Sequence, residues 1–457
     1  MKNIADIFKA YDIRGIYGKQ LDEEIVKKIA QFFGELLKKE NPHKTLTLAV
    51  AQDMRLSSPS LTKSVIAGLV ERGINVVDVG LVSTPAFYFS VAEFNYDGGL
   101  MISASHNPKE YNGLKLVRHS ALPVSGNTGI KQIRDQIVQG IILPHHQQPG
   151  RVITRSDIVK KHVQSAIQFS SLENIKPFKI VIDAANSMGA TYFNELFKEL
   201  PCQVIKMNFE LDGSFPNHEA DPFKEQNNLS LMKRIKQEKA DLGIATDGDG
   251  DRIFYFDNEG KLIDQSIIRG LLAQIFLKTN PGAAICYDLR PGKITKDMIE
   301  AAGGKPVVTR VGHSLIKEQA LKTGAVFAGE SSGHFFVKTP IGFFEAPVIV
   351  TLKLLQQWSV SDQTIADQVR PLRKYYQSGE INSDVEDKAG VMAKILKKYQ
   401  AEAQTVSQLD GITLEYSDFW FNVRASNTEA KLRLNLEAKT PELCQEKTQE
   451  LLALIRA

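Results

Sequence analysis

The sequence predicts an α/β protein in which three related α/β domains with mixed, largely parallel sheets precede a C-terminal α+β domain. Short runs rich in valine and isoleucine alternate with longer stretches of helical periodicity, as is typical of α/β chains. Three segments, 46–53, 179–183 and 283–288, each end a predicted strand with an aspartate. Each is followed by a helical stretch, a second apolar run and a third strand that ends in a polar loop. The pattern indicates one structural plan used three times.

The first repeat carries clear helix signals. Apolar residues recur with helical spacing over Glu23–Glu40, which predicts a helix with one buried face. Proline suits the first turn of a helix, so Ser58-Pro59 predicts the start of a second helix, and we expect it to run to Gly73. The second apolar runs of the three repeats predict the neighbouring strands at Ile74–Val79, Cys202–Met207 and Pro306–Val311.

Changes in composition mark the joins between domains. The length of 457 residues suits three or four domains. Residues 144–150 combine prolines, histidines, glutamines and a glycine, which indicates a surface connection, and residues 257–260 have the composition of a turn. The stretch from Arg370 changes character and ends with a predicted strand at 431–438 and a helix at 441–456. We therefore predict four domains, at residues 1–150, 151–258, 259–369 and 370–457.

Charge and composition argue against several classes of protein. Lysine plus arginine number 56 and aspartate plus glutamate number 53, so a net charge of +3 argues against a nucleic-acid binder driven by bulk charge. No run of about 18 apolar residues occurs, so we expect no membrane span, and the polar N-terminus argues against a signal peptide. The three cysteines are too widely spaced for a disulfide framework or a zinc site. We expect a cytoplasmic monomer that binds small molecules.

A serine-containing loop follows the apolar run at residues 99–102. It consists of Ser103-Ala104-Ser105-His106-Asn107-Pro108, at the carboxyl end of a predicted parallel strand, where open α/β sheets bind ligands. A serine here is a candidate nucleophile or phosphate carrier, and His106 and Asn107 offer hydrogen bonds beside it. Lys115 follows closely enough to reach the same site. The alternatives are a plain Ser/Asn turn and a solvated surface lysine.

An acidic loop ends the third strand of the second repeat. In Asp247-Gly248-Asp249-Gly250-Asp251-Arg252, three carboxylates alternate with glycines that permit a tight backbone path. Such carboxylates can converge on one hard cation such as Mg²⁺. An EF-hand would need a glutamate where Asn258 stands, so that interpretation is set aside. The remaining alternative, an acidic turn without a ligand, suffers from repulsion among three like charges.

Two further loops carry groups that bind sugars and anions. Gly329–His334 presents a carboxylate and hydroxyls, and Arg424–Glu429 combines an arginine, hydroxyls and an amide, with Arg433 nearby. Either loop alone also suits an ordinary turn. Together, a serine, a carboxylate cluster and an arginine-hydroxyl loop are what phosphoryl transfer requires. The four loops predict a central cleft around a small phosphorylated substrate.

With these motifs the chain resembles the α-D-phosphohexomutase family, and most of all its bacterial phosphomannomutase/phosphoglucomutase branch. The resemblance covers nearly the whole chain and rests, in order, on Tyr11–Gly15, Ser103–Pro108, Asp247–Arg252, Gly329–His334 and Arg424–Glu429. It implies four domains around a central cleft. It also implies an isomerase that interconverts the 1- and 6-phosphates of mannose and glucose. A phosphorylated Ser105 would exchange its phosphoryl group through hexose 1,6-bisphosphate, which also acts as primer.

The same resemblance implies roles for individual residues. Mg²⁺ would be held by the phosphate on Ser105 and by Asp247, Asp249 and Asp251. Ser105 would carry the phosphoryl group. Arg14, His106 and Lys115 are our candidates for proton transfer and charge support beside it, and Lys115 or His106 suits the proton transfer better than an arginine. The residues implied in substrate binding are Tyr11, Arg252, Arg290, His313, Glu330, Ser331, Ser332, Gly333, His334, Arg424, Ala425, Ser426, Asn427, Thr428 and Arg433. Ser331 stands where this branch often has methionine, which leaves the preferred hexose open.

Three alternatives to a mannose and glucose phosphate mutase remain at this stage. A phosphoglucosamine mutase would use the same chemistry on an amino sugar. A phosphatase built on serine and metal would release phosphate to water without a bisphosphate primer. A sugar-phosphate sensor would bind hexose phosphates and leave Ser105 unphosphorylated.

Overall fold

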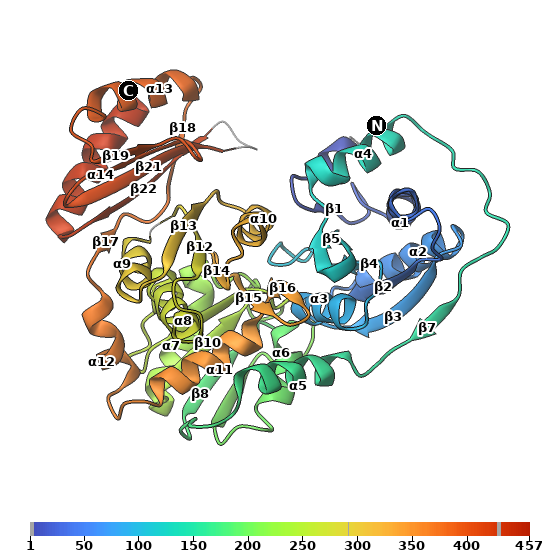
Figure 1. The fold of residues 1–457 in the computed structure, drawn as a ribbon, viewed down its shortest axis with the longest axis horizontal. Coiled ribbons are helices and arrows are strands. Elements are labelled where there is room, and N and C mark those ends of the chain that lie inside the picture. Colours follow the sequence, from blue (N-terminus) through green and yellow to red (C-terminus); the bar gives the residue numbers. More distant parts are fainter. Residues whose placement is uncertain (1–3, 291, 427–430) are drawn as a thin grey trace. The chain divides into compact units, whose positions relative to one another are not determined.

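A computed structural model describes residues 4–290, 292–426 and 431–457 of the chain (Figure 1). The chain forms two compact units. The first consists of Met1–Leu262 and Gly333–Ile365, and the second of Ile263–Ser332 and Ala366–Ala457. Among the described residues, no helix combines the length and the apolar character that crossing a membrane requires.

The first unit begins with a seven-stranded mixed sheet. Its strand order is β1-β5-β4-β2-β3-β7, with β6 beside β5. Strands β4, β2, β3 and β7 run parallel, whereas β1, β5 and β6 join in antiparallel fashion. The strands are β1 (Ile13–Ile16), β2 (Thr47–Gln52), β3 (Asn75–Leu81), β4 (Gly98–Ile102), β5 (Tyr111–Arg118), β6 (Leu122–Pro123) and β7 (Val152–Thr154).

Helices cover both faces of this sheet. Its strands are therefore continuous apolar runs, because side chains on both faces are buried. Leu48 and Val50 pack into the core under α1, α2 and α4, whereas Ala49 and Ala51 face α3 and α5. The helix predicted at Glu23–Glu40 is confirmed, and the carboxylate of Asp22 caps it by accepting from the Ile25 N–H. The helices are α1 (Glu23–Glu40), α2 (Ser58–Val70), α3 (Thr84–Glu93), α4 (Ile130–Val138) and α5 (Ile158–Ser170).

A four-stranded sheet completes the first unit. Its order is β11-β10-β8-β9, and β11 is its antiparallel edge. The hydroxyls of Tyr255 on β11 and Thr351 on α11 share a 2.9 Å hydrogen bond, which joins the returning segment to this domain. The elements are β8 (Lys179–Asp183), α6 (Gly189–Leu196), β9 (Gln203–Met207), α7 (Glu225–Glu238), β10 (Leu242–Thr246), β11 (Ile253–Phe256), β15 (Phe335–Thr339), β16 (Gly342–Glu345) and α11 (Pro347–Trp358).

The second unit holds the third repeat and the C-terminal domain. In the repeat, β12 lies between β13 and β14, and all three run parallel. The carboxylate of Glu437 on the C-terminal sheet accepts from the N–H groups of Gly292 (3.1 Å) and Lys293 (3.0 Å), where α9 begins. The elements of the repeat are α8 (Gln265–Thr279), β12 (Ala284–Asp288), α9 (Lys293–Ala301), β13 (Lys305–Thr309), α10 (His313–Thr323) and β14 (Phe327–Gly329).

The C-terminal domain is an antiparallel sheet with two helices packed on it (Figure 1). Its order is β17-β22-β21-β20-β19, with β18 also on β22. The strand predicted at 431–438 and the helix predicted at 441–456 are confirmed. Helix α12 (Ile365–Val369) precedes this domain, whose elements are β17 (Tyr376–Gln377), β18 (Ile381–Asp384), α13 (Lys388–Tyr399), β19 (Thr405–Ser407), β20 (Ile412–Glu415), β21 (Phe419–Ala425), β22 (Lys431–Ala438) and α14 (Pro441–Arg456). Single 3₁₀ turns occur at Ile4–Ile7, His119–Ala121, Gly126–Thr128 and Arg370–Leu372.

The three predicted repeats share one strand order. In each, the aspartate-ended strand lies in the centre, the second apolar run on one side and the third strand on the other: β3-β2-β4, β9-β8-β10 and β13-β12-β14. The carboxyl ends of parallel strands meet at one edge of a sheet. The polar loops that follow β4, β10 and β14 are therefore displayed at the corresponding edge of each sheet.

A buried histidine makes the stability of the first unit depend on pH. His162 on α5 is 4% exposed, its ring packs 5.5 Å from that of Phe89, and burial lowers its pKa from 6.5 to about 4. The unfolded chain therefore binds a proton between pH 6.5 and 4 that the folded protein does not. The free energy of unfolding should fall by about 3 kcal/mol as the pH drops through this range. Urea unfolding at several pH values measures it, and His162→Phe should remove this part of the pH dependence. An unchanged pH profile in the variant would contradict the assignment.

Candidate active site

Ser105 occupies a constrained position directly after β4. Its backbone has a φ of +50°, in the left-handed region that disfavours residues with a Cβ, and its side chain is 1% exposed. The Ser103 hydroxyl accepts a hydrogen bond from the Ser105 N–H at 3.0 Å, which supports this turn. The loop thus presents one serine hydroxyl from a backbone that neighbouring groups must hold in place.

Arg55 provides most of that support, and the sequence analysis did not identify it. Its buried guanidinium donates to the carbonyl oxygens of Ser105 (2.7 Å), Asn107 (2.6 Å), Pro108 (2.8 Å) and Tyr111 (2.9 Å). A planar group with five N–H donors can bind several carbonyls at once. The sequence feature that could have identified Arg55 is its position two residues after Asp53, which ends the first predicted strand.

The acidic loop after β10 brings three carboxylates together beside this serine. Ligand atoms of Asp247, Asp249 and Asp251 lie within 4.8 Å of one another, and all three side chains are buried. The Ser105 hydroxyl donates to Asp247 Oδ2 at 2.7 Å. A Cβ at Gly248 would lie 2.2 Å from the Ser105 carbonyl oxygen, so the two loops approach as closely as they do because this residue is glycine.

Charge is unevenly distributed over this cluster. Lys115 on β5 forms ion pairs with Asp249 (2.8 Å) and Asp251 (2.6 Å), and although burial opposes it, these carboxylates raise the pKa of Lys115 well above its usual value. Burial and Asp251 oppose ionisation of Asp249, yet Lys115 holds the pKa of Asp249 below its usual value. By contrast, burial and the two other carboxylates raise the pKa of Asp247 well above its usual value. The single positive charge of Lys115 therefore does not neutralise the negative charge of three carboxylates.

The donor set fits a hard divalent cation. Asp249 Oδ2 accepts from the Thr84 hydroxyl at 2.6 Å, whereas Asp249 Oδ1 is buried and accepts no hydrogen bond from the described residues. A buried carboxylate oxygen without a partner calls for an explanation, and a bound cation supplies one. Thr84, which the sequence analysis missed, is the first residue of α3. Its hydroxyl therefore connects this helix to Asp249.

Two further predicted residues flank the serine. His106 Nδ1 lies 3.2 Å from the Ser105 hydroxyl. Burial and the positive charges of Arg252 and Arg14 lower the pKa of His106 well below its usual value, so its imidazole is neutral at pH 7. Arg14 on β1 donates to Asn107 Oδ1 at 2.6 Å and to Asp12 at 2.8 Å. Tyr11 precedes the same strand.

The chain that returns to the first unit adds His334 to the cluster. Arg252 Nε donates to His334 Nε2 at 3.1 Å, and His334 Nδ1 lies 3.5 Å from Asp251 Oδ1. Gly333, at a φ of +89°, accepts from the Ile253 N–H and fixes this approach. Glu345 on β16, which the sequence analysis missed, forms a second group of possible metal ligands with Asp251 and His334. Contacts within the first unit thus connect Arg14, Ser105, His106, Lys115, the three aspartates, Arg252 and His334.

In the second unit, Asp288 organises the loop after β14. It accepts from Arg269 (2.6 Å), Arg290 (2.6 Å) and the Ser331 hydroxyl (2.9 Å), and although burial opposes ionisation, the two arginines hold its pKa below the usual value. The neighbouring Glu330 and Ser332 hydrogen-bond to each other at 3.3 Å. Glu330 also accepts from the Gly312 N–H at 2.9 Å, next to His313, the first residue of α10.

The predicted anion loop contains a pair of arginines around one carboxylate. Arg424 and Arg433 face each other across β21 and β22, and Glu380 binds both, at 2.6 Å and 3.4 Å. Although burial opposes ionisation, these arginines and Arg290 hold the pKa of Glu380 below its usual value. The sequence analysis missed Glu380. Ala425 ends β21 and Ser426 follows it, whereas Asn427 and Thr428 lie outside the described residues.

Comparison with protein families gives matches along most of the chain. The chain matches the four domains of the phosphoglucomutase/phosphomannomutase family in order. These are α/β/α domain I at residues 5–140, α/β/α domain II at 160–260, α/β/α domain III at 264–375 and the C-terminal domain at 380–454. The chain belongs to the α-D-phosphohexomutase family. This confirms the resemblance and the four-domain α/β architecture with mixed sheets. The domain boundaries at 150, 258 and 369 stay predictions.

Individual relatives agree with this assignment. The phosphomannomutase of Vibrio cholerae is 36% identical over 98% of both chains. Phosphohexose mutases of Xanthomonas campestris are 36% identical over 98% of this chain and 99% of theirs. The crystal structure of a phosphoglucomutase/phosphomannomutase family protein from Burkholderia thailandensis superposes with a TM-score of 0.89 at 30% identity, over 99% of this chain and 98% of that one. The enzyme is therefore an isomerase, a phosphomutase of hexose phosphates.

Arg55 offers a test of how the serine loop is positioned. A lysine cannot bind four carbonyls at once, so Arg55→Lys should let the loop shift and lower turnover about 10- to 100-fold. Steady-state mutase assays measure this effect. Arg72→Lys is the matched control, because Arg72 is also buried but pairs with Glu35 instead. Equal losses in the two variants would show general destabilisation and contradict the positioning role.

Proposed function

We propose that this phosphomutase interconverts the 1- and 6-phosphates of mannose and glucose through a phosphorylated Ser105. The observation that carries the proposal is the 2.7 Å hydrogen bond between the Ser105 hydroxyl and Asp247, at the edge of three buried carboxylates. A serine that carries a phosphate beside three carboxylates needs a cation to offset the repulsion. The donor set and the unpartnered oxygen of Asp249 support such a cation.

Mg²⁺ is the ion that we propose, held by Asp247, Asp249, Asp251 and the Ser105 phosphate. When bound, it would neutralise charge on the transferring phosphoryl group. Lys115 adds positive charge through its ion pairs with Asp249 and Asp251.

The proposed transfer is balanced within the protein and the substrate. The bond between the phosphorus and Ser105 Oγ breaks as a free hydroxyl of the hexose phosphate attacks, which forms a hexose 1,6-bisphosphate. We assign the proton transfer to His106, because its neutral imidazole lies 3.2 Å from the Ser105 hydroxyl. It would accept the proton of the attacking hydroxyl and return it in the reverse step. The bisphosphate then presents its other phosphate, which returns to Ser105. Arg14 and Arg252 would supply positive charge near Ser105.

The remaining residues are proposed to bind the rest of the substrate. Glu330 and Ser332 offer a carboxylate and a hydroxyl to sugar hydroxyls. Arg424, Arg433 and Arg290 supply positive charge for the phosphate that does not react. Tyr11, His313, Ser331, Gly333, His334, Ala425, Ser426, Asn427 and Thr428 stay predictions from the family resemblance, as does a cytoplasmic location.

Ser105 is tested first with a panel of substrates. Ser105→Ala removes the proposed phosphate carrier, so turnover should fall about a thousandfold or more. The variant should still bind hexose phosphates. Mannose 1-phosphate, glucose 1-phosphate and glucosamine 1-phosphate are assayed with Mg²⁺ and a trace of bisphosphate. Ser90→Ala is the control, because its buried hydroxyl donates to the Phe87 carbonyl instead.

Each alternative function gives a distinct result in these assays. Comparable activity on mannose and glucose phosphates is the expected outcome. Dominant activity on glucosamine phosphate would identify an amino-sugar mutase with the same mechanism. Release of inorganic phosphate without primer would identify a phosphatase. Full activity of Ser105→Ala would sink the phosphoserine mechanism.

The metal site is tested by direct binding. Asp249→Asn removes a charge and the unpartnered oxygen together, and should weaken Mg²⁺ binding at least about tenfold in titration calorimetry. Asp212→Asn is the control, because the Asp212 carboxylate accepts from the Ser214 N–H at 2.8 Å in its own loop and does not belong to the cluster. Equal Mg²⁺ affinity in the two variants would contradict the assignment of the cation to this cluster.

A further inference from the structure

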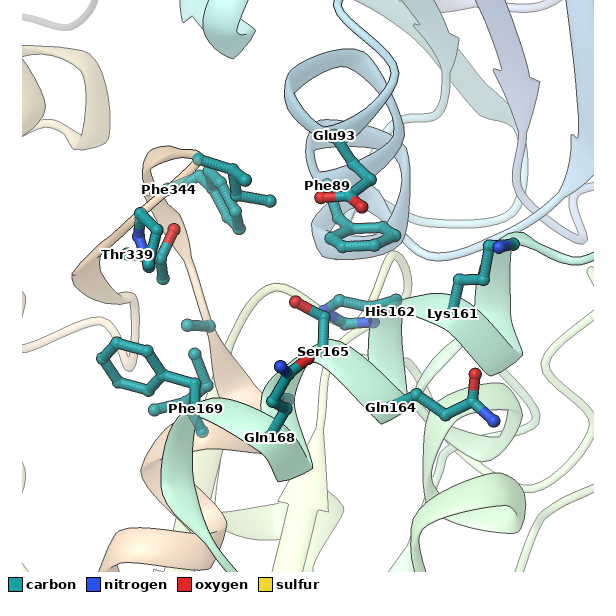
Figure 2. Close-up of a pocket in the computed structure, with 15 residues that line it drawn as sticks. Phe89, Glu93, Lys161, His162, Gln164, Ser165, Gln168, Phe169, Thr339 and Phe344 are labelled. Atoms are coloured by element: carbon teal, nitrogen blue, oxygen red, sulfur yellow. The ribbon is translucent and has the colours of Figure 1, made fainter.

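A cavity of about 560 Å³ opens on the first unit, lined by none of the residues assigned to catalysis or to the metal (Figure 2). Its walls come from three places in the chain: α3, α5, and the β15–β16 hairpin with the start of α11. Its size suits a drug-sized organic molecule. Figure 2 shows Phe89, His162, Ser165 and Gln168 on one side of the opening and Thr339, Phe344 and Phe169 on the other.

The lining combines aromatic surface with a few polar groups. Phe89, Phe169 and Phe344 supply aromatic faces, and the hydroxyl of Ser165 and the amide of Gln168 lie beside them. His162 is 4% exposed, and its Nδ1 is buried without a hydrogen-bond partner among the described residues. A buried ring nitrogen without a partner, at the wall of a cavity, is suited to a hydrogen bond from a ligand.

The charges around the cavity favour a neutral ligand. Burial keeps the His162 imidazole uncharged at neutral pH, with a pKa of about 4. The two ionic side chains of the lining, Lys161 and Glu93, have opposite signs. Lys161 is also paired with Asp157 at 3.7 Å. The wall therefore presents apolar surface and neutral hydrogen-bonding groups rather than a field for an anion such as a sugar phosphate.

Two walls of the cavity lead to the carboxylate cluster. Phe344 and Ala346 line the cavity, and Glu345 between them lies with His334 and Asp251. Helix α3 contributes Phe89 and Glu93 to the cavity, and its first residue, Thr84, donates to Asp249 at 2.6 Å. A ligand that shifts either wall would therefore move a group that hydrogen-bonds to Asp249 or lies within 4.8 Å of Asp251.

We propose that this cavity is an effector site for small neutral aromatic molecules that carry a hydrogen-bond donor, and that its occupancy is linked to the carboxylate cluster through α3 and β16. The aromatic ring packs among Phe89, Phe169 and Phe344. The donor binds His162 Nδ1, with the imidazole proton on Nε2. The binding part stands independently of the proposed function, whereas the linkage rests on the cation assigned to the cluster.

Titration calorimetry with indole tests the binding. Indene, which has the same shape without the N–H group, is the matched ligand, and His162→Phe, which keeps an aromatic ring, is the matched variant. We expect indole to bind with a Kd below about 1 mM. Replacing indole with indene, or His162 with phenylalanine, should each weaken binding about 5- to 10-fold. Indene with His162→Phe should bind no more weakly, because both changes remove the same hydrogen bond. Ser165→Trp should abolish binding by filling the cavity, and His43→Phe, at an exposed histidine elsewhere, should leave it unchanged.

Two results would overturn the binding site. One is the absence of indole binding to the wild-type protein at the solubility limit. The other is binding that survives in Ser165→Trp, which would place the indole elsewhere. Indene that binds as tightly as indole would overturn the role of His162. Urea unfolding of each variant checks that the unit remains folded.

The linkage is tested by measuring Mg²⁺ affinity with and without saturating indole. Coupling should change the Mg²⁺ affinity about fivefold or more, and Mg²⁺ should change the indole affinity by the same factor. Equal Mg²⁺ affinities in the two conditions would refute the linkage and leave the binding site in place. A protein that binds indole but no Mg²⁺ would refute the metal site and the linkage that rests on it.

Discussion

Three carboxylates buried side by side are the constraint around which the first unit is arranged. Asp247, Asp249 and Asp251 repel one another, and burial removes the water that would screen them. Lys115 forms ion pairs with two of them, and the third accepts from the Ser105 hydroxyl. The Ser105 hydroxyl is therefore held by a carboxylate that a bound cation would also contact. The proposed nucleophile and the proposed metal site thus depend on the same set of charges.

Support for this cluster comes from parts of the chain that contain no recognisable motif. Arg55 holds the backbone of the serine loop, Thr84 holds Asp249, and Glu345 lies near Asp251. Each of these residues follows or ends a strand, or begins a helix, so its position is set by the sheets. Helices and strands thus place the groups around the cluster, while the loops carry the residues proposed for catalysis and metal binding.

The sequence predicted the elements of this fold well where local signals were strong. The helix at Glu23–Glu40 has both an apolar stripe and a capping aspartate, and its bounds match the structure. The second helix ends at Val70 rather than Gly73, because Gly73 adopts a φ of +68° that ends helical geometry. The antiparallel strand β5 and the return of residues 333–365 to the first unit were not predicted, since they depend on contacts between distant segments.

In the candidate site, too, the sequence predicted residues in local motifs and missed those that depend on distant contacts. Ser105 and the aspartates stand in loops whose composition is unusual, so the sequence alone singled them out. Arg55 looks like any surface arginine until its burial is known, and Glu380 lies 44 positions from Arg424, which it binds. Residues that act through distant partners carry no local signal, whereas those that form a compact motif do.

Glu380 gives the arginines of the C-terminal sheet an internal counter-ion. A phosphate that binds Arg424 and Arg433 must exchange with this carboxylate, because Glu380 already contacts both guanidinium groups. The free energy of binding is then the difference between two anionic partners and not the full attraction of uncompensated arginines. When the phosphate departs, the carboxylate can take its place at once, so the arginines are not left unpaired. For the phosphate proposed to bind here, this exchange of anions favours a short residence time, as suits an enzyme that must release its product.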